Sequence, residues 1–446
     1  MAQERLWPDG GGCETDPAAD PAPCTGSWQA RLNVPIRNQV EMMVRDLESL
    51  IAEDHAVRAI WALVLRLNLA AFYAPIKAVL GGPGHPATDP RVLVALWIYA
   101  CVEGVGSARQ LDRLCHEHDA FRWLRGGVPV NYHLLADFRV QHGAALDDLM
   151  SQVLAAMMAE GLVTLKRVSQ DGMRVRANAG ASSFRREKKL QECLAVAQAQ
   201  VQALATQVSD TGKPVSQRQE TARERAARER EERVQKALKE LPLVQAAKKG
   251  KRKAQEARVS TTDPEARVMK MPDGGFRPAY NMQLATDTGS QVVVGVAITN
   301  HGGDGHEAPP MLKQVQGRTG VTPEDYLVDG GFATLQAIDD LSAAGVTVYA
   351  PTQPPRGSKR TQAEPRATDS PAVAEWRARM ATEEAKSIYR ERAATSECVN
   401  GCLREHQGLQ RFLVRGPVKV LCIALWMALT HNILRWIALA SQHCQV

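Results

Sequence analysis

The sequence predicts an α/β protein with a mixed five-stranded sheet, preceded by a helical domain and interrupted by a helical insert. β-rich runs alternate with helical patterns over residues 160–180 and 262–440, and residues 181–261 between them have helical composition. Residues 31–150 hold short helical patterns separated by glycine turns. With 446 residues, 44% hydrophobic and 23% charged, the chain can form two or three globular domains with sizeable cores.

Helix-start signals organise the segment 31–150. Asp89-Pro90 predicts a capped helix that runs through Tyr99, and Ser107 begins another that runs through His118. Asn131 is expected to cap a third, Leu134–Gln141. Short helices joined by glycine turns favour a helix-turn-helix-like DNA-binding bundle, although most small helical bundles bind no DNA. Residues 1–30 are rich in Pro, Gly, Asp and Ala and are expected to be disordered.

The order of elements predicts the topology of the sheet. The expected elements are a strand Leu162–Asp171, the insert, a hairpin of Tyr280–Thr286 and Gln291–Ile298, a helix Ala308–Gln316, a strand Tyr326–Asp329, a helix Thr334–Ala344, a strand Val346–Ala350, a loop and a long helix Ala372–Glu405. This order is a ribonuclease H-like topology with one domain inserted after the first strand.

The insert is the basic part of the chain. Residues 174–260 contain 21 Lys and Arg against 10 Asp and Glu, a net charge of +11, which leaves −5 for the rest. Two helices are expected, Arg185–Gln207 and Ser216–Leu241, with a break at Thr211–Pro214. The run Lys248–Lys253 favours contact with phosphates. A solvated spacer or a dimerising arm is the alternative.

The stretch Leu421–Ala440 has about the length and apolarity of a membrane helix. It contains His431, Asn432 and Arg435, and the sequence has no second such span, so a buried helix on the sheet is the better prediction. The N-terminus shows no apolar signal region. Nine scattered cysteines without a CxxC pair favour inert thiols in a reducing cytosol over a metal site.

Three carboxylates stand where a divalent-metal site could form. Asp171 and Asp329 each end an apolar run, and Glu397 lies in a polar helical stretch. Two neighbouring strands ending in carboxylates, faced by a helix with a third, can hold two cations that activate a hydroxyl and stabilise a leaving oxygen. Oxygen ligands alone favour Mg²⁺ or Mn²⁺ over Zn²⁺.

Other polar residues are rival candidates for this site. Asp304 could be a further ligand, but turn formation explains it as well. Glu391 and Glu405 are rival third carboxylates, and Glu391 is expected to face solvent. His301 and His306 flank a glycine-rich loop and are more often structural or incidental than catalytic.

From about residue 37 to residue 436 the chain resembles DDE transposases of bacterial insertion sequences, nearest to the branch numbered eleven-eighty-two within the IS-four and IS-five group. The residues that carry the resemblance are Gly84-His85-Pro86, Gly104 to Leu111, Phe138-Arg139, Asp171 to Ala179, Asp329-Gly330-Gly331-Phe332, the set Tyr389, Arg392, Glu397 and Arg404, Arg411 to Gly416, and Asn432 to Arg435. Two departures stand out. Arg404 replaces the Lys that the family prefers, and the spacing from Arg392 to Glu397 is one residue longer than the commonest form.

The resemblance implies metal-dependent strand cleavage and strand transfer at the ends of an insertion sequence. Asp171, Asp329 and Glu397 would be the catalytic and metal-binding residues, with two Mg²⁺ or Mn²⁺ ions bridged by Asp171. Arg392 and Arg404 would hold phosphates or orient Glu397, and Tyr389 would contact a displaced nucleotide. Further residues expected to bind DNA or support the site are Arg109, Arg139, Arg174, Arg176, Lys251 and Arg252.

The implied partners are double-stranded DNA, as terminal inverted repeats and target, and a second copy of the chain. The expected location is the bacterial cytoplasm, at the nucleoid, with no membrane contact. Three rival functions stay open: a nuclease of the same fold that does not join ends, a catalytically inactive DNA-binding derivative, and a coiled-coil scaffold supported only by the insert.

Overall fold

The computed structural model describes residue 38 and residues 44–79, 81–82, 85–207, 217–248, 250–352 and 364–443. The chain divides into two units, residues 1–45 and 46–446, and nearly all described residues belong to the second. The expected disorder of residues 1–30 and the expected break at Thr211–Pro214 lie outside the described residues.

The N-terminal part of the second unit is helical, as predicted. Its elements are a 3₁₀ turn Glu48–Leu50, α1 (Ala56–Arg66), α2 (Ala70–Tyr73), α3 (Pro90–Val102), α4 (Ala108–Glu117), α5 (Asp119–Arg125), α6 (Tyr132–Gln141) and α7 (Gly143–Ala159). The three predicted caps are confirmed, because the side chains of Asp89, Ser107 and Asn131 accept hydrogen bonds from the first backbone N–H groups of α3, α4 and α6. DNA binding by a helix-turn-helix stays a prediction.

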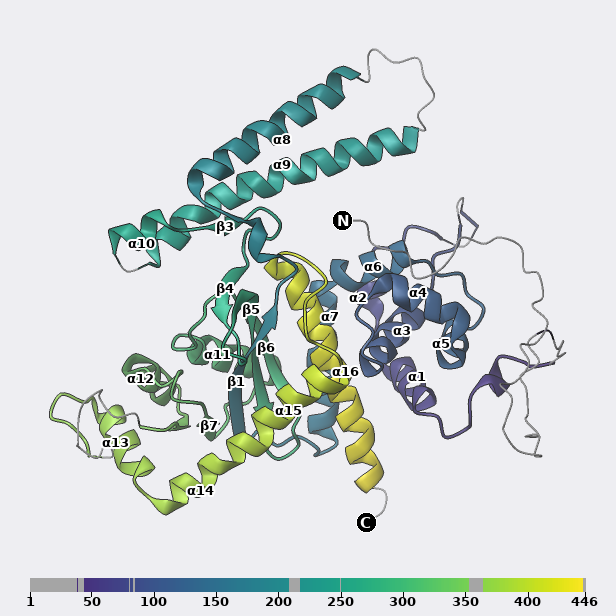
Figure 1. Ribbon diagram of the computed structural model, residues 1–446. Coiled ribbons are helices and arrows are strands. Elements are labelled where there is room, and N and C mark those ends of the chain that lie inside the picture. The colour runs from purple at the N-terminus through teal and green to yellow at the C-terminus, as the bar shows by residue number, and fades with distance from the viewer. Residues whose placement is uncertain are drawn as a thin grey trace, which may run out of the picture. The chain divides into compact units, whose positions relative to one another are not determined.

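A mixed sheet forms the centre of the described unit (Figure 1). Its strands are β1 (Arg167–Arg176), β4 (Arg267–Lys270), β5 (Phe276–Asp287), β6 (Val293–Thr299), β7 (Asp325–Leu327) and β8 (Thr347–Tyr349). The order is β4-β5-β1-β7-β8, with β6 also paired to β5. β1 is antiparallel to β5 and parallel to β7. This arrangement is consistent with the predicted ribonuclease H-like topology, and β4 is a strand that the sequence pattern did not indicate.

The first strand differs from its prediction. It was expected over Leu162–Asp171, but β1 begins at Arg167 and ends at Arg176. The reason is its pairing: β5 is long enough to hydrogen-bond β1 from Val168 to Arg176, and this keeps the polar second half extended. Asp171 therefore lies in the middle of a strand and not at its end.

Helices follow the strands in the predicted order, with one correction. They are α11 (Ala308–Thr319), α12 (Leu335–Ala343), α13 (Pro371–Met380), α14 (Glu383–Arg392), a π-helical segment Ala393–Glu397, α15 (Cys398–Gly401), a second π-helical segment Cys402–His406 and α16 (Pro417–His443). The single helix expected over Ala372–Glu405 is broken after Met380, because Thr382 begins a new helix by accepting a hydrogen bond from Ala385 N.

α16 is the long apolar helix near the C-terminus. Its length and composition would let it cross a membrane, yet 78% of its most apolar window is buried inside the protein. It packs against β6 on one side and α3 and α7 on the other (Figure 1). Three of its polar residues bond the turn after β5 and the start of β6: His431 to Gln291 O, Asn432 to Val293 N and O, and Arg435 to Ser290 O. The prediction of a buried helix on the sheet is confirmed.

Between β1 and β4 the described residues form two long helices that lie side by side, α8 (Glu187–Gln207) and α9 (Gln217–Ala246) (Figure 1). The short elements around them are a 3₁₀ turn Ala181–Ser183, β2 (Phe184–Arg185), α10 (Lys251–Gln255) and β3 (Val259–Ser260). β2 pairs with β3, so the two ends of this segment lie next to each other. A small apolar cluster of Leu190, Ala237, Leu241, Ala257 and Val259 holds the base together.

Candidate active site

The pairing of β1 with β7 brings Asp171 level with Asp329. The last paired residues of these parallel strands are Ser169 and Leu327. Each aspartate lies two residues further along its own strand direction, so both carboxylates emerge where β7 ends. The two aspartates thus come to one level of the sheet, although Asp171 does so from the middle of β1 and not from a strand end as expected.

Asp171 is held by three neighbours. Its Oδ1 accepts a hydrogen bond from Gly172 N at 3.0 Å and lies 2.9 Å from Arg392 Nη2, while its Oδ2 accepts one from Asn400 Nδ2 at 2.9 Å. Burial raises the pKa of this carboxyl; Arg392 opposes the shift, and the charge of Asp329 adds to it. A cation bound between two such carboxylates would relieve the repulsion between their charges.

Asp329 lies in a tight turn after β7. Its Oδ1 accepts a hydrogen bond from Gly331 N at 2.7 Å, and its carbonyl accepts one from Phe332 N at 3.2 Å. A Cβ at position 331 would lie 2.9 Å from Asp329 Oδ1, so glycine is needed for the turn to close around the carboxylate. Phe332 is buried and anchors the turn in the core.

Glu397 is exposed on the helical stretch that follows α14. Its neighbours on the same stretch face the sheet: Ser396 Oγ is hydrogen-bonded to Ser169 Oγ at 2.6 Å, and Asn400 reaches Asp171. Within the described residues no three His, Cys, Asp or Glu side chains are grouped closely enough to hold a metal ion. The strand register thus brings Asp171 and Asp329 to one level, while Glu397 is exposed and follows directly after Ser396, whose side chain faces the sheet.

A π-helical segment, Ala393–Glu397, separates Arg392 from α15. A π turn holds about one residue more than an α turn because its hydrogen bonds run from residue i to i+5. The extra residue between Arg392 and Glu397, relative to the commonest family spacing, falls within this segment. Because the wide turn absorbs that residue, Arg392 and Asn400 both reach Asp171 from one helical stretch.

Tyr389 lies on the same stretch and is partly buried against the core. Burial raises the pKa of its hydroxyl; Arg392, which is hydrogen-bonded to it, opposes the shift, and Asp329 and Asp171 add to it. Arg392 thus contacts Asp171 directly, and the charges of both aspartates act on the Tyr389 hydroxyl. The structure places Arg392 on Asp171, where the sequence had suggested a phosphate or Glu397 as its partner.

Two predicted basic residues serve the fold. Arg139 is 8% exposed, donates to Gly106 O and lies over the ring of Trp97 at 4.8 Å. Burial lowers the pKa of Arg139 to about 10. The expectation that Arg139 contacts DNA is corrected, because its guanidinium is enclosed by α3 and the turn before α4. Arg174 likewise donates to Lys270 O and Gly302 O and so ties β1 to the end of β4 and to the loop after β6.

The remaining basic candidates are more open to solvent. Arg109 is exposed and lies over the ring of Tyr132, and Arg176 is exposed at the end of β1. Arg252 has an exposed side chain, while the side chain of Lys251 lies outside the described residues. Arg404 is half-buried, with Nη2 at 3.5 Å from Arg174 O.

The rival carboxylates have other surroundings. Glu391 does not simply face solvent as expected: it pairs with Arg167, which also pairs with Asp325, and so joins α14 to β1 and β7. Glu405 is exposed and accepts a hydrogen bond from Gln410. Asp304 accepts hydrogen bonds from two side chains of β5.

Asn400 is the neighbour of Asp171 that sequence reasoning missed. Its Oδ1 is buried without a hydrogen-bond partner among the described residues, although its Nδ2 is used. No motif marks an asparagine three residues after Glu397. Only the packing of this helical stretch on β1 reveals its position.

The donor chemistry of the site suits a hard divalent cation. Carboxylate oxygens of Asp171 and Asp329 and the unpartnered amide oxygen of Asn400 are the ligand types that Mg²⁺ and Mn²⁺ prefer. Arg392 supplies positive charge at Asp171 and would have to share or leave that place when a cation is bound. The residues present therefore fit the metal ions that the sequence suggested.

Two families of transposase domains match parts of the chain. Residues 243–433 match a family described as Transposase DDE domain, and residues 45–141 match Transposase domain (DUF772). Both matches support a DDE transposase of insertion sequences. Asp171 lies between the matched segments, and the pairing of β1 with β5 and β7 attaches it to the DDE domain. Comparisons with curated proteins and with solved structures give no match.

Proposed function

We propose that this protein cuts and joins DNA strands at the ends of an insertion sequence, using two Mg²⁺ or Mn²⁺ ions held by Asp171, Asp329 and Glu397. The observation that carries the proposal is the register of β1 and β7, which places Asp171 and Asp329 side by side inside a transposase-like sheet. Membership of the eleven-eighty-two branch remains part of this proposal.

The metal ions would supply a lowered pKa for the attacking water or 3′-hydroxyl and charge for the leaving oxygen. Residues of the chain orient the carboxylates that would bind these ions. Asn400 and Gly172 fix the orientation of the Asp171 carboxylate, and the Gly331 turn fixes that of Asp329. Glu397 is exposed next to this face, so a change of rotamer together with the bound cations would bring it in as the third ligand.

DNA would be held by the basic surface outside this site. Arg109, Arg176 and Arg252 have exposed side chains, and the segment with α8, α9 and α10 carries most of the excess positive charge. Phosphate contacts of this kind are sequence-independent and depend on salt. Joining two ends in one reaction calls for a homodimer, and the expected place of action is DNA in the bacterial cytoplasm, at the nucleoid.

The proposal is tested with supercoiled DNA that carries the element's own ends. Cleavage and end-joining are measured with Mg²⁺, with Mn²⁺ and with EDTA, for the wild type and for Asp329→Asn. Asp340→Asn, which removes an exposed carboxylate from α12, is the matched control. We expect metal-dependent cutting and joining by the wild type and the control, and loss of both in Asp329→Asn.

Other outcomes point to the rival functions. Cutting without joining under every metal would favour a nuclease of this fold. Binding of the ends without cutting would favour an inactive DNA-binding derivative. Activity that survives in Asp329→Asn would refute the assignment of the site.

A further inference from the structure

We propose that Asp304 is a positioning carboxylate of the acidic site, fixed by a buried chain of amides on the other face of β1, and that its charge strengthens divalent-cation binding at Asp171 and Asp329. The inference rests on the proposed function, because it concerns the same metal site. Neither the sequence motifs nor the family matches assign this role to Asp304.

A chain of hydrogen bonds ends on Asp304. Tyr326 OH donates to Gln170 Oε1 at 2.7 Å, Gln170 Nε2 donates to Gln283 Oε1 at 2.9 Å, and Gln283 Nε2 donates to Asp304 Oδ1 at 2.7 Å. Asn281 Nδ2 donates to the same oxygen at 2.6 Å. Gln170, Asn281 and Gln283 are each fully buried within the sheet. Gln283 and Asn281 thus both donate to one oxygen of Asp304, which stabilises its negative charge, and Gln170 holds Gln283 in place.

Glycine at position 172 makes room for this carboxylate. Side chains alternate along a strand, so position 172 faces away from the side of Asp171. A Cβ there would lie 2.6 Å from Asp304 Oδ1, 2.6 Å from Gln283 Nε2 and 2.9 Å from Asn281 Oδ1. Because Gly172 has no side chain, Asp304 approaches the backbone next to Asp171 as closely as the strand allows.

The orientation of the Asn281 amide is set by the negative charge of Asp304. An ionised carboxylate only accepts hydrogen bonds, so Asn281 must turn its Nδ2 towards Asp304. This leaves Asn281 Oδ1 buried without a hydrogen-bond partner among the described residues. A buried acceptor without a partner is unfavourable, and it is tolerated here while the Asn281 donor stays on Asp304.

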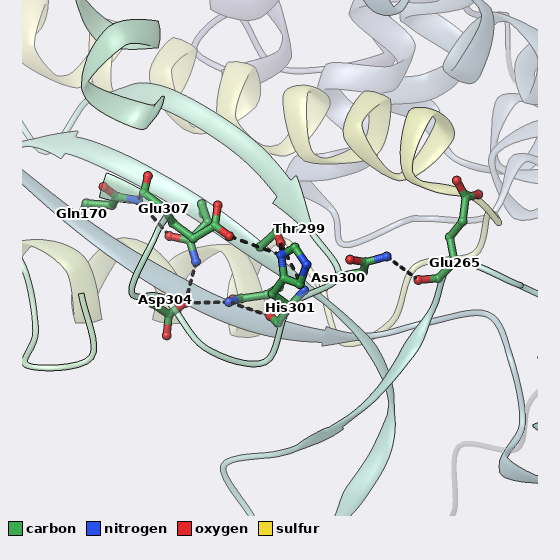
Figure 2. A network of polar contacts seen from close by, with 9 residues as sticks. Gln170, Glu265, Thr299, Asn300, His301, Asp304 and Glu307 are labelled. Atoms are coloured by element: carbon green, nitrogen blue, oxygen red, sulfur yellow. Dashed lines mark hydrogen bonds and ion pairs between the residues drawn. The ribbon is translucent and has the colours of Figure 1, made fainter. Parts of the chain in front are cut away.

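The segment that carries Asp304 also reaches the turn of Asp329. Thr334 Oγ1 donates to Gly305 O at 3.2 Å, and Asp304 O accepts a hydrogen bond from Glu307 N at 3.0 Å. Figure 2 shows Asp304 beside Glu307 and His301 on this segment, with Gln170 of β1 nearby. Asp304 thus lies against the backbone next to Asp171, its own segment is joined to the start of α12, and its charge adds to the raised pKa of Asp171.

The test is Mn²⁺ binding by the full-length protein without DNA, measured from the electron paramagnetic resonance of free Mn²⁺. The variants are Asp171→Asn, Asp304→Asn and the control Glu307→Gln, which removes a charge from the same segment. Asn at 304 keeps an oxygen for Gln283 and Asn281 but removes the charge. We expect Asp171→Asn to abolish binding at the site and Asp304→Asn to weaken it about tenfold, with Glu307→Gln close to wild type.

The Mn²⁺ binding of these variants tests the role of Asp304 separately from the metal site itself. Binding that depends on Asp171 but is unchanged in Asp304→Asn overturns the role of Asp304 and leaves the proposed function standing. Absence of any Asp171-dependent binding refutes the metal site itself, and the inference with it. If Asp304→Asn lowers the melting temperature, Asp304→Glu, which keeps the charge, must recover most of the Mn²⁺ affinity. Failure of that rescue would also overturn the proposal.

Discussion

At the scale of single residues, Asp171 and Glu397 are the carboxylates whose replacement tests the proposed metal site. Replacement of Asp171 by Asn removes the charge and keeps one acceptor oxygen for Gly172 N, while Asn400 has to turn its unpartnered Oδ1 towards the new amide NH2. We expect Asp171→Asn and Glu397→Gln each to lower strand cleavage by several orders of magnitude while DNA binding stays nearly unchanged. Gel-shift and cleavage assays on one DNA substrate measure both quantities. Full cleavage by Glu397→Gln would show that the third ligand lies elsewhere.

Gly172 is expected to tolerate no side chain. The added methyl of Gly172→Ala would meet Asp304, Gln283 and Asn281 at under 3 Å, and all three belong to a buried polar network. We predict a loss of about 1–3 kcal/mol in the free energy of unfolding, since the strand or the segment with Asp304 must shift. Chemical denaturation measures it. Gly302→Ala, in open space on the same segment, is the control. Equal stability of the two variants would contradict the packing described.

The sequence reveals some of these residues and hides others for a physical reason. Asp329 is readable because an apolar run ends at it and glycines follow. Asp304 could be named as a candidate ligand from the sequence, but its contact with Gly172 could not be predicted, because that contact depends on the register in which β1 pairs with β5. Asn400 is hidden too, since its angular position depends on a π-helical segment that no residue type announces.

At the scale of elements, the pair α8 and α9 is the part of the chain whose role the fold explains least. Its ends meet at β2 and β3, so residues 187–256 can be replaced by a short Gly-Ser linker. We expect the shortened protein to bind DNA more weakly and with a flatter salt dependence. The log–log slope should fall by about 0.9 for each phosphate that the protein no longer neutralises. Binding isotherms at several salt concentrations measure this.

A matched variant separates charge from shape in the same segment. Arg252→Gln with Lys253→Gln removes two positive charges from α10 and leaves the helices in place. If α10 contacts phosphates, the double variant should reproduce part of the change in slope. An unchanged slope in both proteins would rule the segment out as a phosphate-binding element and favour a spacer or a dimerising arm.

Element boundaries show where local patterns fail. The caps of α3, α4 and α6 were readable because each depends on a side chain and the N–H groups two or three residues later. The bounds of β1 were not readable, because its long-range pairing with β5 decides them. The break before α14 was missed although its signal, the Thr382 cap, is local.

At the scale of the whole molecule, α16 joins the sheet to the N-terminal helices through buried polar residues. His431 is bonded to Gln291 O at 2.8 Å, and burial lowers the pKa of its imidazole below the ordinary value of 6.5. The stability that depends on neutral His431 is full above the unfolded pKa. It is lost as the pH falls below that value, because the unfolded chain takes up the proton first.

We therefore predict a lower free energy of unfolding at about pH 5.5 than at about pH 7.5, measured by urea denaturation. His431→Gln should reduce this pH dependence. Part of it should remain, because burial also lowers the pKa of His142. His133→Gln, at an exposed position, is the control and should not change it. A pH dependence that is unaltered in His431→Gln would show that another group governs acid stability.

The central claim is that Asp171 and Asp329 form one divalent-cation site. The most direct measurement is anomalous diffraction at the manganese absorption edge, from crystals of the wild type and of Asp329→Asn grown with Mn²⁺. We predict an anomalous peak between the two carboxylates in the wild type and its loss in the variant. A wild-type crystal with Mn²⁺ bound elsewhere and none at Asp171 would contradict the account.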